Sequence, residues 1–260
     1  MPLTKPHTAD GTVPTAYDGP VEIRLCSNRD TLARAAATVI RDRLRAKPNL
    51  AMAVPAGRTP RRMYTVLRDL HARAPLPFER MRVFSIDELL PPAPSDGYFW
   101  RQVRAELLSW APIDPGRCHP FQVAAPDLDV MCKEYEDAIA RVGGLDLVMM
   151  GLGPNGHIAS NEPGCDFTCR TRVTRLWPET AAYILTDEVI QGAVSDRAVT
   201  LGVATILEAR EIVVLVSGAA KRAALHRMLH GEETPELPAS VLRRHPRCVV
   251  ITDREAYPID

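Results

Sequence analysis

Short apolar runs separated by helix-like segments constrain the fold of this 260-residue chain more than any other feature. The runs lack the polar alternation of strands that face water on one side, so we expect strands that are covered on both faces. Segments with apolar residues at helical spacing lie between them and would supply the crossover connections. The runs lie at 21–27, 50–56, 80–87, 145–150, 211–217 and 248–253. This pattern predicts an α/β fold, a doubly wound, mostly parallel sheet with helices on both faces.

The N-terminal segment differs from the rest of the chain. Residues 1–20, "MPLTKPHTADGTVPTAYDGP", are rich in Pro, Thr, Gly and Asp and have no periodicity. Such a composition is typical of a flexible or surface-lying tail. We find no internal repeat and no domain boundary after it, so residues 21–260 are expected to form a single domain.

Composition and charge argue against several classes of partner. Hydrophobic residues make up 46% of the chain and charged residues 25%, and the formal net charge is zero. No basic stretch interleaved with aromatic residues occurs, so a nucleic-acid partner or an anionic membrane has no electrostatic support. No apolar run reaches the roughly 18 residues that span a bilayer, and the N-terminus lacks a signal pattern. We therefore expect a cytoplasmic protein.

The six cysteines do not form a metal-binding pattern. Only Cys165 and Cys169 are close together, and no second pair completes a zinc site. Reduced thiols are the simpler interpretation, and we expect neither a metal nor a cofactor.

Four loops follow the expected strands and contain residues suited to chemistry. They are "VPAGRTP" (54–60), "SIDELL" (85–90), "GLGPNGHIASNEPG" (151–164) and "VSGAAK" (216–221). Because ligands of open α/β sheets bind outside the carboxyl ends of the strands, the four loops are expected to converge on one site.

Two of these loops have the features of an anion site. In "VPAGRTP", Thr59 is placed as the N-cap and Pro60 as the first helical residue, so free N–H groups and the helix dipole would suit a phosphate. In "VSGAAK", Lys221 falls in the first turn of a helix, where a cation is unfavourable unless an anion lies nearby. An ordinary helix start and a solvated lysine would give the same patterns.

The other two loops supply acids and an imidazole. Asp87 and Glu88 end a strand, and because side chains alternate along a strand, only one of them can face a given site. A carboxylate there would serve as a general base or only as a cap of the next loop. His157 lies on a glycine-rich loop five residues before Glu162. A nearby carboxylate is expected to orient the imidazole and to raise its pKa.

Taken together, these loops resemble the superfamily of glucosamine-6-phosphate deaminases and 6-phosphogluconolactonases. The family motif Gly-x-Gly-x-Asp-Gly-His-x-Ala corresponds to "GLGPNGHIA" (151–159) here. The segments "NEPG", "CRTRVTRL", "AVTLGVATILEAREIVVLVSGAAKRAAL" and "LPASVLRRHPRCVVITD" resemble the deaminase branch. The resemblance covers nearly all of the chain from about residue 21 and implies a Rossmann-like fold of the deaminase and lactonase type.

The resemblance also implies roles for individual residues. Asp87 would move a proton between C2 and C1 of an opened amino-sugar phosphate. His157 would catalyse ring opening, with Glu162 tuning it and Asn155 beside it. The residues that the resemblance assigns to phosphate and substrate contacts are Ala56, Gly57, Arg58, Thr59, Glu88, Gly153 and Lys221. The implied partner is a small sugar or sugar phosphate, the implied classes are hydrolase and isomerase in amino-sugar metabolism, and homo-oligomerisation is left open.

Several positions depart from the family pattern. Asn155 replaces the motif's aspartate, so the imidazolium of His157 should be less favoured. Arg58 stands where the phosphate loop usually has glycine, and it would narrow the pocket or clamp an anion. Thr186 stands where deaminases have a second phosphate-binding arginine, and Leu89 stands where lactonases have arginine and deaminases tyrosine.

Two alternatives to a deaminase follow from these departures. Ser160 is closer to the lactonase branch, in which His157 would activate water to open a sugar lactone. Asn155 and Thr186 would also fit a catalytically silent protein that only binds a sugar phosphate. Arg170 and Arg172 resemble a segment that some deaminases use for regulation, although a surface or structural role is the simpler interpretation.

Overall fold

The main sheet has eight strands and is parallel except at one edge. The computed structural model describes residues 12–13, 17–91, 97–185 and 195–257. The strands occur in the order β1-β2-β11-β10-β7-β3-β4-β6, and all neighbours pair in parallel except β1 with β2. Their bounds are β1 Thr12–Val13, β2 Glu22–Cys26, β3 Ala51–Val54, β4 Arg82–Ser85, β6 Cys118–His119, β7 Leu147–Gly151, β10 Ile212–Val216 and β11 Cys248–Asp253. The predicted doubly wound, mostly parallel sheet is confirmed.

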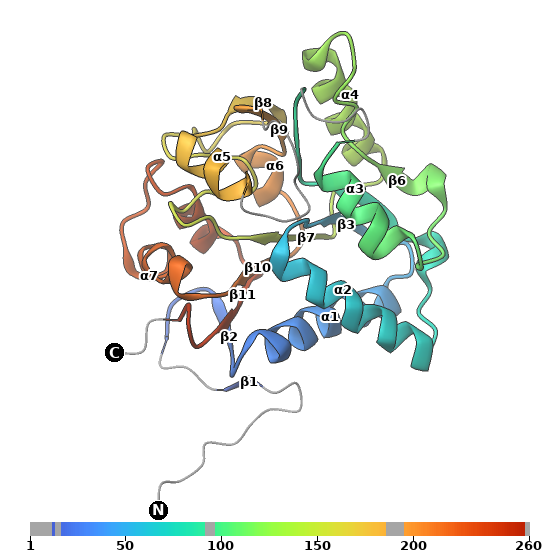
Figure 1. Cartoon of the computed structure of the whole chain (residues 1–260), viewed down its shortest axis with the longest axis horizontal. Helices are drawn as coiled ribbons and strands as arrows, with labels where there is room; N and C mark the ends of the chain where they lie inside the picture. Colours follow the sequence, from blue (N-terminus) through green and yellow to red (C-terminus); the bar gives the residue numbers. More distant parts are fainter. Residues whose placement is uncertain (1–11, 14–16, 92–96, 186–194, 258–260) are drawn as a thin grey trace, which may run out of the picture.

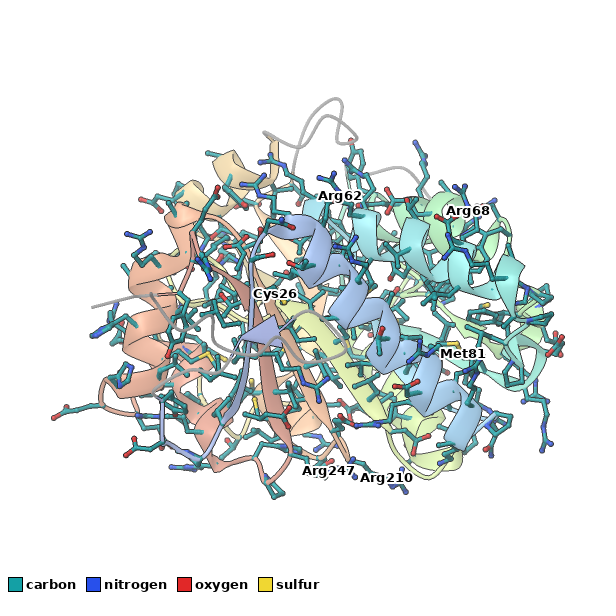
Figure 2. The ribbon with its side chains drawn as sticks, turned by 90° about the horizontal axis from the view of Figure 1, so that it is seen from below. Cys26, Arg62, Arg68, Met81, Arg210 and Arg247 are labelled. Atoms are coloured by element: carbon teal, nitrogen blue, oxygen red, sulfur yellow. The ribbon has the colours of Figure 1, made fainter. Side chains whose placement is uncertain are left out.

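Helices cover both faces of this sheet (Figure 1). On one face, α1 (Arg29–Ala46) lies beside α2 (Arg58–Arg73), and α3 (Phe99–Val103) joins them. Figure 2 views the molecule from the side on which α1 crosses the strands. The other face packs against α4 (Leu128–Arg141), α6 (Val203–Leu207) and α7 (Arg222–His230). None of the helices that the structure describes has the length and apolar sequence needed to cross a membrane.

Alternate residues of each central strand enter opposite cores, which explains the continuous apolar runs. In β7, Val148 and Met150 belong to the α4 side, whereas Leu147 and Met149 belong to the α1 side. The strands β3, β10 and β11 divide their side chains in the same way. Because both faces are buried, a polar residue on either face would lose its water without gaining a partner.

A second, three-stranded antiparallel sheet was not predicted. It has the order β5-β9-β8, with β5 at Asp87–Leu89, β8 at Arg172–Arg175 and β9 at Arg197–Thr200. The helix α5 (Pro178–Leu185) lies between β8 and β9 in the chain. This sheet begins immediately after β4, so it holds Asp87 at the carboxyl end of the main sheet.

Within the predicted flexible or surface-lying tail, β1 pairs antiparallel with β2 at the sheet edge; residues 1–11 and 14–16 lie outside the described residues. One predicted helix start needs correction. The helix after β3 begins at Arg58 with Gly57 as its N-cap, so Thr59 is not the cap. Gly57 has φ +110°, a conformation that glycine adopts without the strain of a side chain, and it lets the helix begin earlier.

Candidate functional site

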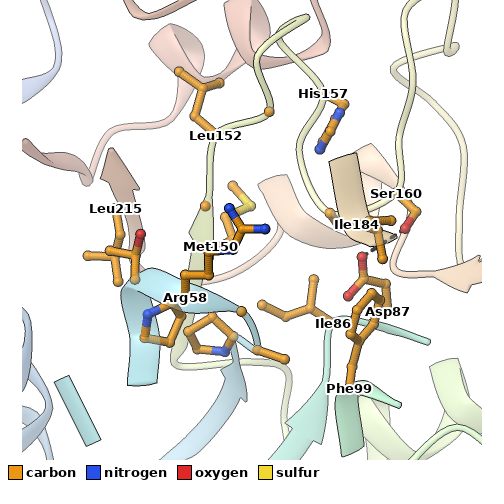
Figure 3. Close-up of a pocket in the computed structure, with 18 of the residues that line it drawn as sticks. Arg58, Ile86, Asp87, Phe99, Met150, Leu152, His157, Ser160, Ile184 and Leu215 are labelled. Atoms are coloured by element: carbon orange, nitrogen blue, oxygen red, sulfur yellow. Dashed lines mark hydrogen bonds between the residues drawn. The ribbon is translucent and has the colours of Figure 1, made fainter. Parts of the chain in front are cut away.

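One pocket of about 200 Å³ lies at the carboxyl ends of β3, β4, β7 and β10, shown in Figure 3. The strands β3 and β7 are neighbours, and the chain continues from β3 to β4 on one side and from β7 to β10 on the other. Such a reversal of strand order opens a crevice for ligands. The lining comes from 55–60, 86–87, 99, 150–153, 157, 159–160, 180, 183–184, 215, 217 and 221. The four loops singled out in the sequence therefore converge on one pocket.

Two cations and an aromatic ring form one part of the pocket. The Lys221 Nζ lies 4.4 Å from the centroid of the Tyr183 ring, and the Arg58 Cζ lies 5.4 Å from it. Lys221 is only 9% exposed. Burial, and then the nearby Arg58 guanidinium, lowers the pKa of Lys221 to about 8. A bound anion would relieve both costs, so this region of the pocket suits a phosphate.

A side chain of α3 holds the loop between β3 and α2 in place. Gln102 Oε1 accepts the Gly57 N–H at 2.9 Å, and Gln102 Nε2 donates to the Gly57 carbonyl at 2.9 Å. Gly57 lines the pocket, but its N–H is already paired, so a phosphate contact through that group is not supported. Ala56, Arg58 and Thr59 also line the pocket. In the first turn of α2, N–H groups such as that of Thr59 have no carbonyl partner within the helix and can face an anion.

Asp87 and Ser160 form the acidic part of the site. Ser160 Oγ donates to Asp87 Oδ2 at 2.8 Å, and both residues line the pocket (Figure 3). Burial raises the pKa of Asp87 to about 7, while the Ser160 hydroxyl opposes this shift and the charge of Glu88 adds to it. A carboxylate that changes protonation near neutral pH can both accept and return a proton.

Glu88 does not reach the pocket, so the expected substrate contact is corrected. Its side chain points away from Asp87, as strand alternation requires, and it is 1% exposed. Its carboxylate accepts the backbone N–H groups of Leu89, Tyr98, Phe99 and Trp100 at 2.8–3.1 Å. Glu88 therefore holds the start of α3 against β5.

Replacing Glu88 with Ala is expected to lower the free energy of unfolding by about 3 kcal/mol or more, because four backbone donors would lose their acceptor. Urea unfolding followed by circular dichroism measures this change. Glu22→Ala provides the control, because Glu22 is exposed on β2 and such a substitution usually changes stability by only about 0.5 kcal/mol. Equal midpoints for the two variants would contradict the assigned role of Glu88.

His157 is held by an amide that is itself held by Glu162. Asn155 Nδ2 donates to Glu162 Oε2 at 2.8 Å, so Asn155 Oδ1 faces the histidine. That oxygen accepts the His157 backbone N–H at 3.1 Å and lies 2.7 Å from His157 Nδ1. Because an amide oxygen only accepts, Nδ1 carries the proton and Nε2 keeps its lone pair. The ring lines the pocket as a neutral acceptor.

The expectation that a carboxylate raises the pKa of His157 is wrong. Burial, and then the charge of Lys221, lowers the pKa of His157 to about 3. The nearest carboxylate oxygen, Glu162 Oε2, is 3.7 Å from Nδ1 and is engaged by Asn155. Gly153 allows this tight placement, because a Cβ there would lie 2.3 Å from ring atoms of His157. The imidazole is therefore neutral at physiological pH.

Replacing Asn155 with Asp should raise the pKa of His157 by about 1 to 3, because the new carboxylate would accept directly from Nδ1–H. Nitrogen-15 NMR of the imidazole during a pH titration measures the change. The double variant Asn155→Asp, Glu162→Gln keeps a single carboxyl charge and places it next to His157 Nδ1. The pKa of His157 should rise in this variant too, without repulsion between two acids. An unchanged titration in both variants would refute the assigned hydrogen-bond chain.

Sequence reasoning missed three residues that shape the site. Tyr183 comes from α5, outside the strand-exit loops, and carries no local signal. Gln102 lies inside a helix, where an amide has no distinguishing pattern. In the sequence, Ser160 indicates only a likeness to the lactonase branch, although its position in the loop after β7 is a signal that could have identified it as a site residue. Thr186 lies outside the described residues.

The remaining sequence candidates have structural partners. Arg170 forms ion pairs with Glu136 at 2.7 Å and with Glu208 at 2.6 Å. Arg172 Nη1 donates to Asn161 Oδ1 at 2.8 Å. Among the residues that the structure places, no cluster of three or more His, Cys, Asp or Glu side chains is arranged to hold a metal ion.

Comparisons with known proteins agree over nearly the whole chain. Residues 27–251 match the family described as glucosamine-6-phosphate isomerases/6-phosphogluconolactonase. The glucosamine-6-phosphate deaminase of Rhodopirellula baltica is 36% identical over 91% of this chain and 94% of its own length. That of Shouchella clausii is 34% identical over 88% of this chain and 93% of its own length.

Solved structures show the same fold. A monomeric glucosamine-6-phosphate deaminase superposes with a TM-score of 0.85 at 29% identity, covering 91% of this chain and 98% of that one. A 6-phosphogluconolactonase from Trypanosoma cruzi superposes with a TM-score of 0.73 at 23% identity, over 93% and 98% of the two chains, and at that identity it shows the fold alone.

These relatives correct the expected hydrolase class. The two curated relatives named above are deaminases, and the lactonase structure shares the fold at low identity. The assignment to the hydrolases is therefore wrong, and deaminase and isomerase chemistry takes its place. With its pocket, its motif and its relatives in agreement, the chain belongs to the family of glucosamine-6-phosphate isomerases and 6-phosphogluconolactonases.

Proposed function

We propose that this protein is a glucosamine-6-phosphate deaminase, which converts glucosamine 6-phosphate and water into fructose 6-phosphate and ammonia. Curated relatives with that name align with this chain over most of their length, which supports the proposal. The observation that carries it is that Asp87 and His157 line the same pocket as Lys221 and Arg58. A sugar phosphate can therefore touch acid–base groups with its sugar and cations with its phosphate. A cytoplasmic location belongs to the same proposal.

The phosphate would bind between the cations and the first turn of α2. Lys221 and Arg58 supply charge, and the Thr59 N–H supplies a donor from the positive end of the helix dipole. Thr186 stands where the family deaminases have a second phosphate-binding arginine, and we propose that Arg58 supplies the missing charge.

The sugar would then react between His157 and Asp87. His157 Nε2 accepts the proton of the C1 hydroxyl and passes it to the ring oxygen as the ring opens. Asp87 takes the proton from C2 and returns it to C1, while O1 gains a proton and the amino group loses one, which leaves a hydroxymethyl group at C1 and an imine at C2. Addition of water to the imine and loss of ammonia give the ketose phosphate. A base with a pKa of about 7 is suited to both halves of this proton transfer.

An assay of both products tests the proposed function. The purified protein is incubated with glucosamine 6-phosphate, and ammonia and fructose 6-phosphate are measured with coupled enzymes. Equal amounts of the two products are expected. Unphosphorylated glucosamine is the matched control, and its kcat/KM should be lower by about two orders of magnitude or more, because the contacts with Lys221 would be lost. Absence of both products from the phosphate would reject the proposal.

The pH dependence of kcat/KM should be bell-shaped, with apparent pKa values of about 7 and about 8. Below the lower value Asp87 is protonated and cannot accept the C2 proton. Above the higher value Lys221 loses the charge that binds phosphate. Since kcat/KM reports ionisations of the free enzyme and the free substrate, the values expected for Asp87 and Lys221 are those of the empty pocket.

The variant Lys221→Arg assigns the alkaline limb, because a guanidinium keeps its charge throughout this range. The limb should move to higher pH in this variant, while the acid limb stays in place. An alkaline limb that does not move would assign it to another group, such as the substrate amine. An acid limb near pH 4 would contradict the raised pKa of Asp87.

A further inference from the structure

Two thiols lie close together in the segment between the His157 loop and β8. The Sγ atoms of Cys165 and Cys169 are 3.3 Å apart. Cys165 is 8% exposed, whereas Cys169 is partly exposed and can be reached from solvent. The proposed deamination uses neither sulfur, and neither residue lines the pocket.

The surroundings of the pair favour one negative charge. Arg172 Nη2 donates to Cys165 Sγ at 3.2 Å, and the Val203 N–H donates to Cys169 Sγ at 3.3 Å. Asn161 Oδ1 lies 3.6 and 3.7 Å from the two sulfurs and accepts from Arg172 Nη1. The guanidinium of Arg172, which contacts Cys165 and whose charge also acts on Cys169, opposes the binding of a metal cation and supports a thiolate in the pair.

We assign the shared proton of the pair to Cys165. The hydrogen bond between the sulfurs, with Cys165 as the donor, raises the pKa of Cys165 and lowers the pKa of Cys169 to about 6; Val203 and Arg172 also lower the pKa of Cys169, against burial. The pKa values of three other cysteines shift in the opposite direction from that of Cys169. Burial raises the pKa of Cys132 to about 11 and that of Cys248 to about 12, and it also raises the pKa of Cys118. Cys169 therefore differs chemically from these three thiols.

We propose that Cys165 and Cys169 form a reversible oxidation site for small peroxides such as hydrogen peroxide, closing an intramolecular disulfide. The Cys169 thiolate attacks one peroxide oxygen and the O–O bond breaks; with one proton taken up, this gives Cys169 sulfenic acid and water. The Cys165 thiol then attacks the Cys169 sulfur, the S–O bond breaks, and a second water leaves. Sulfur loses two electrons in total, and peroxide gains them.

The sulfurs are close enough for the second step to need only a local movement. They must approach from 3.3 Å to the bond length of about 2.05 Å. Formation of the disulfide would also remove the thiol proton near Asn161. Asn161 follows Ser160 in the chain, and Ser160 donates to Asp87. This oxidation does not depend on the proposed deaminase activity, so its test stands apart from the activity assay.

Peptide mass spectrometry on the full-length protein tests the proposal. Trypsin releases residues 142–170 as one peptide that contains both cysteines and no other. The protein is treated with stoichiometric hydrogen peroxide, remaining thiols are alkylated with N-ethylmaleimide, and the digest is compared with an untreated sample. The peptide is expected to lose two hydrogen masses and to escape alkylation. Dithiothreitol should restore two alkylatable thiols.

The other cysteines and two variants complete the test. Cys118, which is partly exposed, should remain alkylatable at the peroxide concentration that closes the pair. In Cys165→Ser the reaction should stop at the sulfenic acid of Cys169, which dimedone traps. In Cys169→Ser no dimedone adduct and no mass loss should form in this peptide. Wild-type protein whose 142–170 peptide keeps both alkylated thiols while Cys118 is oxidised would overturn the proposal, as would a wild-type reaction that ends at the sulfenic acid.

Discussion

Replacing Asp87 with Asn is expected to lower kcat for glucosamine 6-phosphate by about two to four orders of magnitude, the usual contribution of a positioned acid–base group. The amide keeps the shape of the carboxyl group and can still accept from Ser160 Oγ, which donates to Asp87 at 2.8 Å. It cannot take a proton from C2. Because the substrate still fits, KM should change little, and steady-state kinetics of fructose 6-phosphate formation separates the two parameters.

The control for this variant is a carboxylate outside the pocket. Asp69 is exposed on α2, so Asp69→Asn should leave both kcat and KM near the wild-type values. Retention of more than a tenth of the wild-type kcat by Asp87→Asn would assign the proton transfer to another group. A loss confined to KM would make Asp87 a binding residue.

Replacing Lys221 with Met should raise KM for glucosamine 6-phosphate by about two to three orders of magnitude, because truncating a buried charge pair costs about 2–5 kcal/mol. Methionine keeps a long apolar stem against the Tyr183 ring but removes the ammonium that lies 4.4 Å from its centroid. The variant leaves the proposed acid–base groups Asp87 and His157 unchanged, so kcat should fall much less than kcat/KM. Initial rates over a wide substrate range measure both.

Unphosphorylated glucosamine distinguishes the role of this charge. If Lys221 binds phosphate, Lys221→Met should hardly change the low kcat/KM for glucosamine. An equal loss for both substrates would show that Lys221 supports the structure of the pocket instead. Arg58→Met should act in the same direction as Lys221→Met but less strongly, because Arg58 is exposed and its charge is screened by water, whereas Lys221 is buried.

The main sheet was predictable because each of its central strands has a signal within a few consecutive residues. Strands such as β7 and β10 are buried on both faces, so their sequences are continuous apolar runs. The parallel arrangement then brings the following loops to one edge, which places Asp87, His157 and Lys221 together without further information. The expectation about Glu88 failed because the sequence does not show that the N–H groups at 98–100 need a buried acceptor.

The second sheet and the rest of the site depend on distant partners. The strand β5 is three residues long and pairs with β9, more than a hundred positions later, so its sequence alone carries little signal. Tyr183 reaches the pocket only because the same sheet brings α5 across it. The sign of the His157 pKa shift was mispredicted for a related reason: spacing revealed a nearby carboxylate, but not that burial and Lys221 outweigh it.

A crystal structure with 2-amino-2-deoxyglucitol 6-phosphate, an unreactive open-chain analogue of the substrate, tests the central claim most directly. We expect the phosphate within hydrogen-bonding distance of Lys221 Nζ and the first turn of α2, with C1 and C2 beside the Asp87 carboxylate and near His157 Nε2. A phosphate bound away from Lys221, or an analogue whose C2 lies out of reach of Asp87, would contradict it.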